Sequence, residues 1–202
     1  MIRVEDEGEL RIITLDRPDK ANALTPEMLK ELARAAEDAL SSRALILTGT
    51  GSVFSAGADL ESAKAGMAVS PHWERLSHVL SRHKGLTIAA LNGTIAGGAM
   101  GMALACDLRI GVATAKFFYP VMKLGFLPQP SDPARLSALV GPARARLILM
   151  AGAKVTADEA LSWGLLERIV APEALLDEAR ALAADTLAAK PEHAFAIKSL
   201  TR

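Results

Sequence analysis

Two glycine-rich junctions, each between an expected strand and an expected helix, are the segments best suited to chemistry. One is Ser55-Ala-Gly-Ala-Asp59, and the other runs from Asn92-Gly93 to Gly97-Gly98. The first turn of a helix presents unpaired backbone N–H groups and a partial positive charge, and glycine lets a ligand approach the main chain closely. Two such N–H groups aimed at one point form an oxyanion hole. Each junction, taken alone, is better explained as a tight turn.

Other reaction chemistries lack their usual signatures. Neither junction has the G-x-G-x-x-G or G-x-x-x-x-G-K-[ST] pattern of nucleotide binding, and there is no G-x-S-x-G nucleophile elbow. The histidines are not paired at i,i+4 and join no cluster of cysteines or carboxylates, so we expect surface histidines and no metal site. Cys106 lies in an apolar run and is expected to be a buried thiol. The four histidines are His72, His78, His83 and His193.

Composition and charge exclude several further classes. The chain has 23 Lys and Arg against 23 Asp and Glu, and this balance argues against nucleic acid or an anionic membrane surface as a partner. The lone cysteine and an N-terminus without an apolar signal region favour the cytoplasm. Residues 85–106 are uncharged, but the Asn92-Gly93 turn divides them, so we expect a strand and a buried helix and no membrane span.

The elements that position these junctions alternate between strand and helix. Period and turn signals predict strands at residues 3–5, 10–15, 43–48, 87–91, 107–112 and 166–170. Helices are expected at 26–40, 72–84 and 97–106, and short helices follow the proline-rich stretch 117–133. This order predicts an α/β fold with parallel pairing. We expect a core over residues 1–170 and a helical C-terminal segment over 171–202.

The chain resembles the enoyl-CoA hydratase/isomerase (crotonase) family along most of its length. The resemblance rests on six motifs at compatible spacing, which together are specific although each alone is weak. The motifs are LDRPDKANAL at 15–24, ILTG at 46–49 with FSAGADL at 54–60, NGTIAGGAMGMALACD at 92–107, LGFLP at 124–128, RL and VG at 135–141, and TADEALSWGL at 156–165.

The resemblance implies a fold and a substrate. The expected fold is the ClpP/crotonase-like superhelix of β-β-α turns with a helical C-terminal layer. The expected substrate is an acyl-CoA thioester, used in fatty acid metabolism by a lyase or isomerase that stabilises its enolate. Coenzyme A is then part of the substrate, and no permanently bound cofactor is expected. The amides of Ala56 and Gly98 would form the oxyanion hole, and the wider substrate-binding set would be Lys20, Ala21, Ala23, Ala56, Gly57, Ala58, Asp59 and Gly98.

The chain departs from the family at its acid–base positions. Hydratases of this family carry one glutamate three residues after the position of Gly98 and another directly after a proline. Here those positions hold Gly101 and Val121. A third carboxylate position holds Gln129. Because general acid–base catalysis contributes roughly 10²–10⁴-fold per group, we expect poor hydration of enoyl-CoA.

Two further residues are candidates for the missing chemistry. Asp132 replaces a glycine of the family pattern, between Pro130 and Pro133. It is either a local carboxylate for catalysis or the N-cap of a helix over 133–140. Tyr119 either faces the acyl pocket or packs in the core.

Alternatives to the hydratase reaction stay open. A malonyl-type decarboxylase needs mainly the oxyanion hole, and some family decarboxylases carry Pro-Val as in Pro120-Val121. The other alternative is a catalytically inert acyl-CoA-binding subunit. The resemblance also implies a homotrimer or a dimer of trimers. The chain stops at Arg202, where family members continue into further helices, so a shortened C-terminal segment is expected.

Overall fold

The computed structural model describes residues 1–201, apart from the side chain of residue 68. Its larger sheet has the strand order β1-β2-β3-β5-β7-β10. The first two strands form an antiparallel hairpin, and β2, β3, β5, β7 and β10 run parallel to one another. The predicted parallel strands are therefore confirmed. The bounds are β1 Ile2–Glu7, β2 Leu10–Leu15, β3 Ala44–Gly49, β5 Leu86–Leu91, β7 Leu108–Val112 and β10 Arg168–Val170.

A smaller sheet continues three of these strands. Along the chain β3 is followed by β4, β5 by β6 and β7 by β8, and the smaller sheet has the order β4-β6-β8-β9. Each such pair leads into a helix, which confirms the expected β-β-α turns. The bounds are β4 Val53–Ser55, β6 Thr94–Ala96, β8 Lys116–Phe118 and β9 Val155–Thr156.

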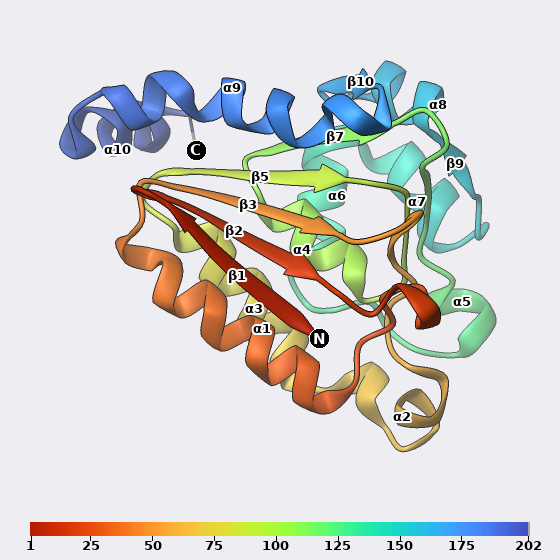
Figure 1. The fold of residues 1–202 in the computed structure, drawn as a ribbon. Coiled ribbons are helices and arrows are strands. Elements are labelled where there is room, and N and C mark those ends of the chain that lie inside the picture. The colour runs from red at the N-terminus through yellow and green to blue at the C-terminus, as the bar shows by residue number, and fades with distance from the viewer. Residues whose placement is uncertain (202) are drawn as a thin grey trace.

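Helices cover both faces of the larger sheet (Figure 1). The helix α9 (Leu175–Ala188) lies along one face, against β3, β5 and β7, whereas α1 (Pro26–Asp38), α3 (Pro71–Arg82) and α4 (Ala99–Ala105) form the layer on the other. The C-terminal helix α9 is thus part of the sheet's cover. The other helices are α2 Leu60–Lys64, α5 Val121–Leu124, α6 Asp132–Val140, α7 Pro142–Leu149, α8 Ala157–Trp163 and α10 Pro191–Leu200.

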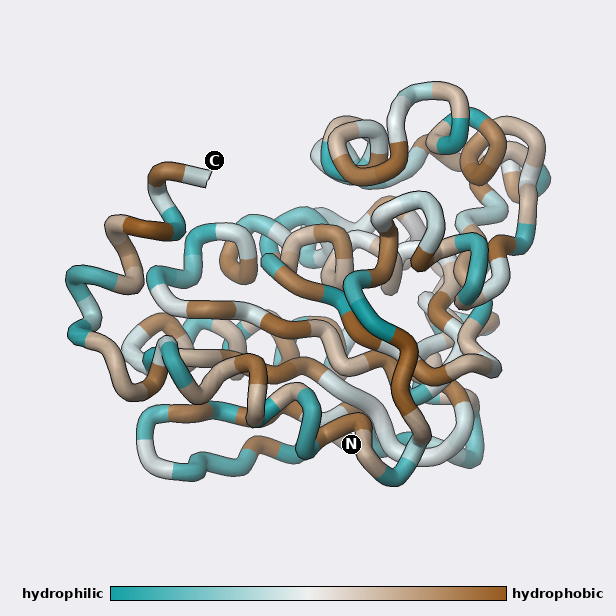
Figure 2. Tube along the Cα trace, turned by 90° about the horizontal axis from the view of Figure 1, so that it is seen from above, coloured by the Kyte–Doolittle hydropathy of each residue, from teal (hydrophilic) through white to brown (hydrophobic). Residues whose placement is uncertain are grey.

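This double cover explains the apolar sequence of the central strands. Residues 44–48 of β3 are all buried, as expected for a parallel strand with helices on both faces. Figure 2 shows hydrophobic residues running through the interior strands and hydrophilic residues gathered in peripheral turns. The same logic sets α1, which begins at its Thr25 cap and Pro26 and buries Met28, Leu29 and Leu32 against the sheet.

His83 departs from the expectation of surface histidines. It follows the last residue of α3 and is fully buried. Its Nδ1 accepts a hydrogen bond from the Gly85 amide at 3.0 Å, and its Nε2 lies 2.8 Å from the Ala39 carbonyl oxygen. Burial lowers the pKa of His83, which fits a neutral ring that joins α1's C-terminal turn to β5. The helical pattern of the sequence did not indicate this, because the chain turns inward only after α3 ends.

Asn22 holds the segment before α1 against the loop after β3. Its Oδ1 accepts from the Arg17 amide at 2.8 Å, and its Nδ2 donates to the carbonyls of Thr50 and Val53 at 2.9 and 2.8 Å. The Asn22 backbone is left-handed, with φ of 51°, a conformation that asparagine tolerates better than most residues. This fully buried amide therefore satisfies three backbone groups at once.

We expect Asn22→Asp to lower the free energy of unfolding by about 2–4 kcal/mol, because each buried group left unsatisfied costs roughly 1–3 kcal/mol. The new carboxylate oxygen would face the Thr50 and Val53 carbonyls with no hydrogen to donate. Urea unfolding followed by circular dichroism measures the change. The matched control is Asp19→Asn at an exposed site nearby. Equal midpoints for the two variants would contradict the assigned role of Asn22.

Candidate functional site

The two glycine-rich junctions meet because their preceding strands are neighbours. β4 and β6 pair in parallel, so both chains leave the smaller sheet at the same edge. Gly57 has φ of +89°, and a Cβ added to it would lie 2.8 Å from the Ala96 carbonyl oxygen. Glycine is therefore required at residue 57 by both backbone conformation and close approach. The structure thus places the predicted junctions side by side.

A cavity of about 450 Å³ opens between the two junctions. Its walls are predominantly apolar, and its polar lining includes the side chains of Lys64, Tyr119 and Gln129. A cleft of this size and character suits a small organic ligand. The lining residues are Ala56, Ala58, Leu60, Ala63, Lys64, Trp73, Ala96, Gly97, Gly98, Phe118, Tyr119, Pro120, Val121, Leu124, Phe126, Leu127 and Gln129.

The amide predicted to serve in the first junction is already used. The N–H of Ala56 donates to the Ala21 carbonyl at 3.0 Å. Leu24 forms a parallel bridge with Ala58, in which the Leu24 amide donates to Gly57 and the Leu24 carbonyl accepts from Asp59. Such a bridge uses the groups on either side of Ala58 and turns the amide of Ala58 itself away. Within residues 1–201 that amide has no acceptor.

The second junction leaves its predicted amide unpaired. The Gly97 N–H donates to the Phe118 carbonyl at 3.1 Å, whereas the Gly98 N–H has no acceptor in the described part of the chain. Both Ala58 and Gly98 line the cavity. The two unpaired amides at the cavity are therefore those of Ala58 and Gly98. The sequence predicted Gly98 and Ala56, and Ala58 takes the place of Ala56. The motif alone did not distinguish the two alanines, because the bridge to Leu24 is a tertiary contact.

Segment 17–23 is fastened to the first junction by an ion pair. The Arg17 guanidinium lies 2.9 Å from Asp59 Oδ2 and donates to the Ala23 carbonyl at 2.8 Å. This contact lowers the pKa of Asp59 through its hydrogen bond with Arg17. Asp59 also caps α2 by accepting from the Glu61 and Ser62 amides. The predicted substrate segments around Ala21 and Ala58 are thus adjacent.

Trp73 is a cavity residue that the sequence did not indicate. Its indole N–H donates to the Met67 carbonyl at 3.0 Å, which fixes the ring against the second junction. A Cβ added to Gly98 would lie 3.1 Å from two ring atoms of Trp73. Residue 98 therefore needs to be small for this indole to form the cavity wall. The available signal was a tryptophan on the apolar side of the expected helix over 72–84.

Asp132 fills the space beside Gly101. A Cβ added to Gly101 would lie 2.7 Å from Asp132 Oδ1 and 2.8 Å from Oδ2, and 3.0 Å from Ser77 Oγ. The carboxylate comes from α6, whereas Gly101 belongs to α4. A side chain at residue 101 and the observed position of Asp132 therefore exclude each other.

The sequence suggested Asp132 either as a carboxylate for catalysis or as a helix N-cap. In the structure its side chain does not cap α6. Ser131 is the N-cap residue of α6 and makes no side-chain capping bond, and Asp132 is the first helical residue. Tyr119 donates its phenolic hydrogen to Asp132 Oδ2 at 3.0 Å, and the backbone N–H of Gln129 donates to the Tyr119 oxygen at 3.3 Å. Asp132 Oδ1 is buried without a hydrogen-bond partner.

Burial changes the protonation of this pair. Desolvation raises the pKa of Asp132 to about 6, against the lowering effects of Tyr119 and Arg135. Burial, with the nearby Asp132 charge, also raises the pKa of Tyr119 far above its usual range. Tyr119 is thus a neutral phenol at every physiological pH, and Asp132 changes charge close to neutrality. Tyr119 lines the cavity and is only 3% exposed.

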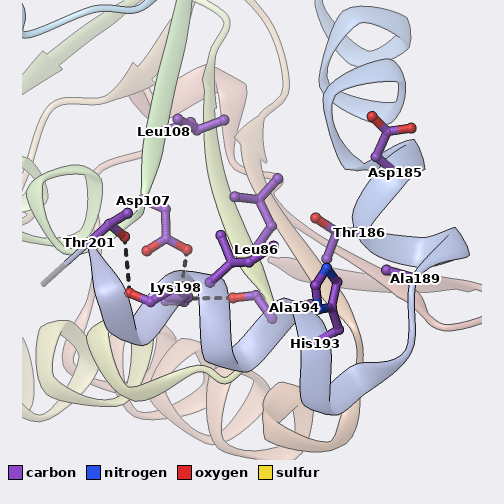
Figure 3. Close-up of a pocket in the computed structure, with 12 residues that line it drawn as sticks. Leu86, Asp107, Leu108, Asp185, Thr186, Ala189, His193, Ala194, Lys198 and Thr201 are labelled. Carbon is purple, nitrogen blue, oxygen red and sulfur yellow. Dashed lines mark hydrogen bonds and ion pairs between the residues drawn. The ribbon is translucent and has the colours of Figure 1, made fainter.

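A second cavity, of about 580 Å³, lies at the other end of β5 and β7 (Figure 3). It is bounded by the starts of these strands, by α9 and by α10. Its partly buried cation, Lys198, is already neutralised by Asp107 at 2.6 Å and donates to the Gly85 carbonyl at 2.8 Å. With this ion pair satisfied, the larger cavity offers less chemistry than the one between the junctions.

Metal and thiol chemistry find no support in the described residues. Within residues 1–201 no group of three or more His, Cys, Asp or Glu is placed to hold a metal ion. Cys106 is buried as expected, and desolvation raises the pKa of its thiol to about 12, so it is no nucleophile. No helix in the same residues combines the length and apolar character needed to cross a bilayer.

Comparison with known proteins gives one family throughout. The family model described as enoyl-CoA hydratase/isomerase matches residues 5–202. The chain is 37% identical over 210 residues to carnitinyl-CoA dehydratase of Salmonella arizonae, covering 100% of this chain and 80% of that protein.

Solved structures agree with the sequence relatives. Enoyl-CoA hydratase from Bacillus anthracis is 30% identical with a TM-score of 0.90, over 98% of this chain and 81% of that one. A Thermobifida fusca protein solved in complex with CoA is 32% identical with a TM-score of 0.90, over 99% and 83% of the two chains.

We expect Asp132→Asn to stabilise the protein at pH 7 and to have little effect on stability at pH 4. A carboxyl whose folded pKa is raised, here from 3.8 to about 6, holds its proton longer in the folded state. The charged form of Asp132 destabilises the folded state relative to the unfolded state. This destabilisation is absent below pH 4 and grows as the pH rises to 6. Two pKa units correspond to about 2–3 kcal/mol.

Chemical unfolding of both proteins at pH 4, 5.5 and 7 measures this difference. Asp185→Asn, at an exposed position on α9, is the control and should show no such trend. A stability difference that stays constant with pH would contradict the raised pKa of Asp132.

Proposed function

Because the chain belongs to the enoyl-CoA hydratase/isomerase family, we propose that it binds an acyl-CoA thioester and stabilises the enolate of the acyl group. The observation that carries this proposal is the pair of unpaired amides, Ala58 and Gly98, at one apolar cavity. The thioester oxygen gains negative charge as the enolate forms, and two backbone donors meet that charge. Such a donor is worth roughly 10²–10³-fold in rate.

The CoA portion is proposed to lie along two adjacent segments. These are residues 20–23 and 56–59, which the Arg17–Asp59 ion pair holds together. The carbonyls and amides of these segments that do not bond one another are available to an adenine ring or a pantetheine chain. A Thermobifida fusca relative was solved in complex with CoA, which supports binding of CoA by a chain of this family.

The reaction is proposed to need at most one acid–base group, which takes a proton from the acyl group and returns one to it. Hydration needs a base for water and an acid for the α-carbon, and the expected positions hold Gly101 in α4 and Val121 at the cavity wall. Neither residue moves protons. Double-bond isomerisation and α-proton exchange fit one acid–base device.

Decarboxylation of a malonyl-type thioester is the second candidate. It generates the enolate by loss of CO₂ and so needs no base, which agrees with Val121 and the apolar lining around it. Incubation with a panel of enoyl-CoA and malonyl-type CoA thioesters, followed by mass spectrometry, separates these reactions. If every thioester binds and none is turned over, the chain is an acyl-CoA-binding subunit instead.

We expect crotonyl-CoA hydration at least about 10⁴-fold slower than a turnover number of roughly 1–10³ per second. The reason is the absence of both acid–base groups at residues 101 and 121. Loss of absorbance of the conjugated thioester measures the rate. Hydration in the ordinary enzymatic range would show that a base acts from elsewhere in the cavity.

We expect Gly98→Pro to lower the rate on whichever thioester is turned over by about 10²-fold or more relative to Gly98→Ala. Both variants add a Cβ against Trp73, but only proline removes the N–H. Gly98 has φ of −59°, which proline adopts. Rates within threefold of each other would exclude the Gly98 amide from the oxyanion hole.

Self-association, as a homotrimer or a dimer of trimers, is also proposed. Large apolar side chains stand on the surface of the described residues, among them Leu60 at 79%, Leu127 at 85% and Leu200 at 86% exposed. The resemblance to the family carries this proposal, and association would cover some of this apolar surface. Multi-angle light scattering at micromolar concentration measures the mass, and a monomer would contradict this expectation.

A further inference from the structure

Tyr119 connects the cavity to a carboxylate that does not reach it. The phenol lines the cavity together with Gly98. Its hydroxyl donates to Asp132 Oδ2 at 3.0 Å. Asp132 is 1% exposed and is absent from the cavity wall. Any exchange of protons between Asp132 and a ligand in the cavity therefore passes through the Tyr119 oxygen.

Asp132 has no adequate structural reason to be a carboxylate. It does not cap α6, and its Oδ1 is buried with no hydrogen-bond partner. A buried carboxylate without full hydrogen bonding destabilises a fold. The glycine at residue 101 supplies the room that this carboxylate occupies. Asp132 is thus a titratable group whose burial destabilises the fold and for which Gly101 leaves room. Such a group beside a cavity residue indicates a role in chemistry.

We propose that Tyr119 and Asp132 form a proton relay that serves the α-carbon of the bound acyl group. This inference rests on the proposed acyl-CoA site. In the forward step the α-C–H bond breaks and its proton passes to the Tyr119 oxygen, while the phenolic proton of Tyr119 passes to Asp132 Oδ2. The electron pair of the C–H bond becomes the enolate, whose negative oxygen is held by the Ala58 and Gly98 amides.

The reverse step returns the proton. Neutral Asp132 gives its proton to the Tyr119 oxygen, and Tyr119 delivers its own proton either back to the α-carbon, which exchanges the α-proton, or to the γ-carbon of the dienolate, which moves the double bond. Tyr119 stays a neutral phenol before and after each step. The Gln129 amide, donating to the Tyr119 oxygen at 3.3 Å, stabilises the partial negative charge that this oxygen carries during transfer.

The charges around Asp132 are compatible with such a relay. Arg135, on the same helix, lowers the pKa of the carboxyl, and Glu74 of α3 raises it. Glu74 also accepts a hydrogen bond from the Ser131 amide at 3.2 Å. The side facing α4 has no titratable group, because residue 101 is glycine. With these neighbours Asp132 holds a proton near pH 6 and releases it above.

Exchange of α-protons tests the relay directly. Butyryl-CoA, which has no double bond to hydrate, is incubated with the protein in deuterium oxide, and deuterium uptake is followed by mass spectrometry. Binding is measured separately by calorimetry with the same thioester. Wild-type protein should exchange the α-protons, with a rate that rises through about pH 6 and then levels, as Asp132 ionises.

The variants Asp132→Asn and Tyr119→Phe should lower exchange by about 10²-fold or more, with dissociation constants within threefold of wild type. Asp132→Asn should also remove the rise near pH 6. The control Ser77→Ala removes the other polar atom beside Gly101 and should leave exchange and its pH profile unchanged.

Three outcomes overturn the proposals, and they are distinguishable. Exchange that persists with its pH profile in Asp132→Asn overturns the relay and leaves enolate stabilisation standing. Binding without exchange in the wild-type protein also overturns the relay and leaves acyl-CoA binding. Failure of the wild-type protein to bind butyryl-CoA overturns the proposed function itself.

Discussion

The parallel pairing of β4 with β6 is the constraint on which the site depends. It brings two junctions that are far apart in sequence to one edge of the smaller sheet. The approach is so close that a Cβ on Gly57 would meet the Ala96 carbonyl at 2.8 Å. Without this contact the amides of the two junctions would face separate surfaces, and no common cavity would form between them.

A second tertiary contact decides which amides stay unpaired. Leu24 forms a bridge with Ala58, in which it bonds to the carbonyl of Gly57 and the amide of Asp59. Ala21 takes the amide of Ala56. Ala21 and Leu24, the residues that bond to the first junction, both belong to segment 21–24. Asn22 holds this segment in place, and so it also holds the first junction in place. Stability at Asn22 and the proposed oxyanion hole at Ala58 are therefore linked through the same loop.

The carboxylate nearest to the cavity residue Tyr119 comes from α6 and not from α4. Residue 101 on α4 is glycine, and the carboxylate of Asp132 from α6 occupies the adjoining space. Asp132 lies behind Tyr119, out of direct contact with the cavity. Burial then raises the pKa of Asp132 to about 6, a value useful for taking and returning a proton near neutrality.

Local sequence patterns were sufficient for the elements and their class. The apolar run of β3, the Thr25-Pro26 start of α1 and the turn at Asn92-Gly93 each have a local physical cause, so strands, helices and the parallel sheet were predictable. The motifs also predicted that both junctions lie at one site, and they singled out Gly98, whose amide has no acceptor within residues 1–201. Only the tertiary structure showed that the unpaired amide is that of Ala58 and not that of Ala56, and that His83 is buried. It also placed Trp73 against Gly98 and made Asp132 a hydrogen-bond partner of Tyr119 and not a helix cap. These outcomes depend on hydrogen bonds and close packing between segments distant in sequence, and such contacts leave no periodic pattern along the chain.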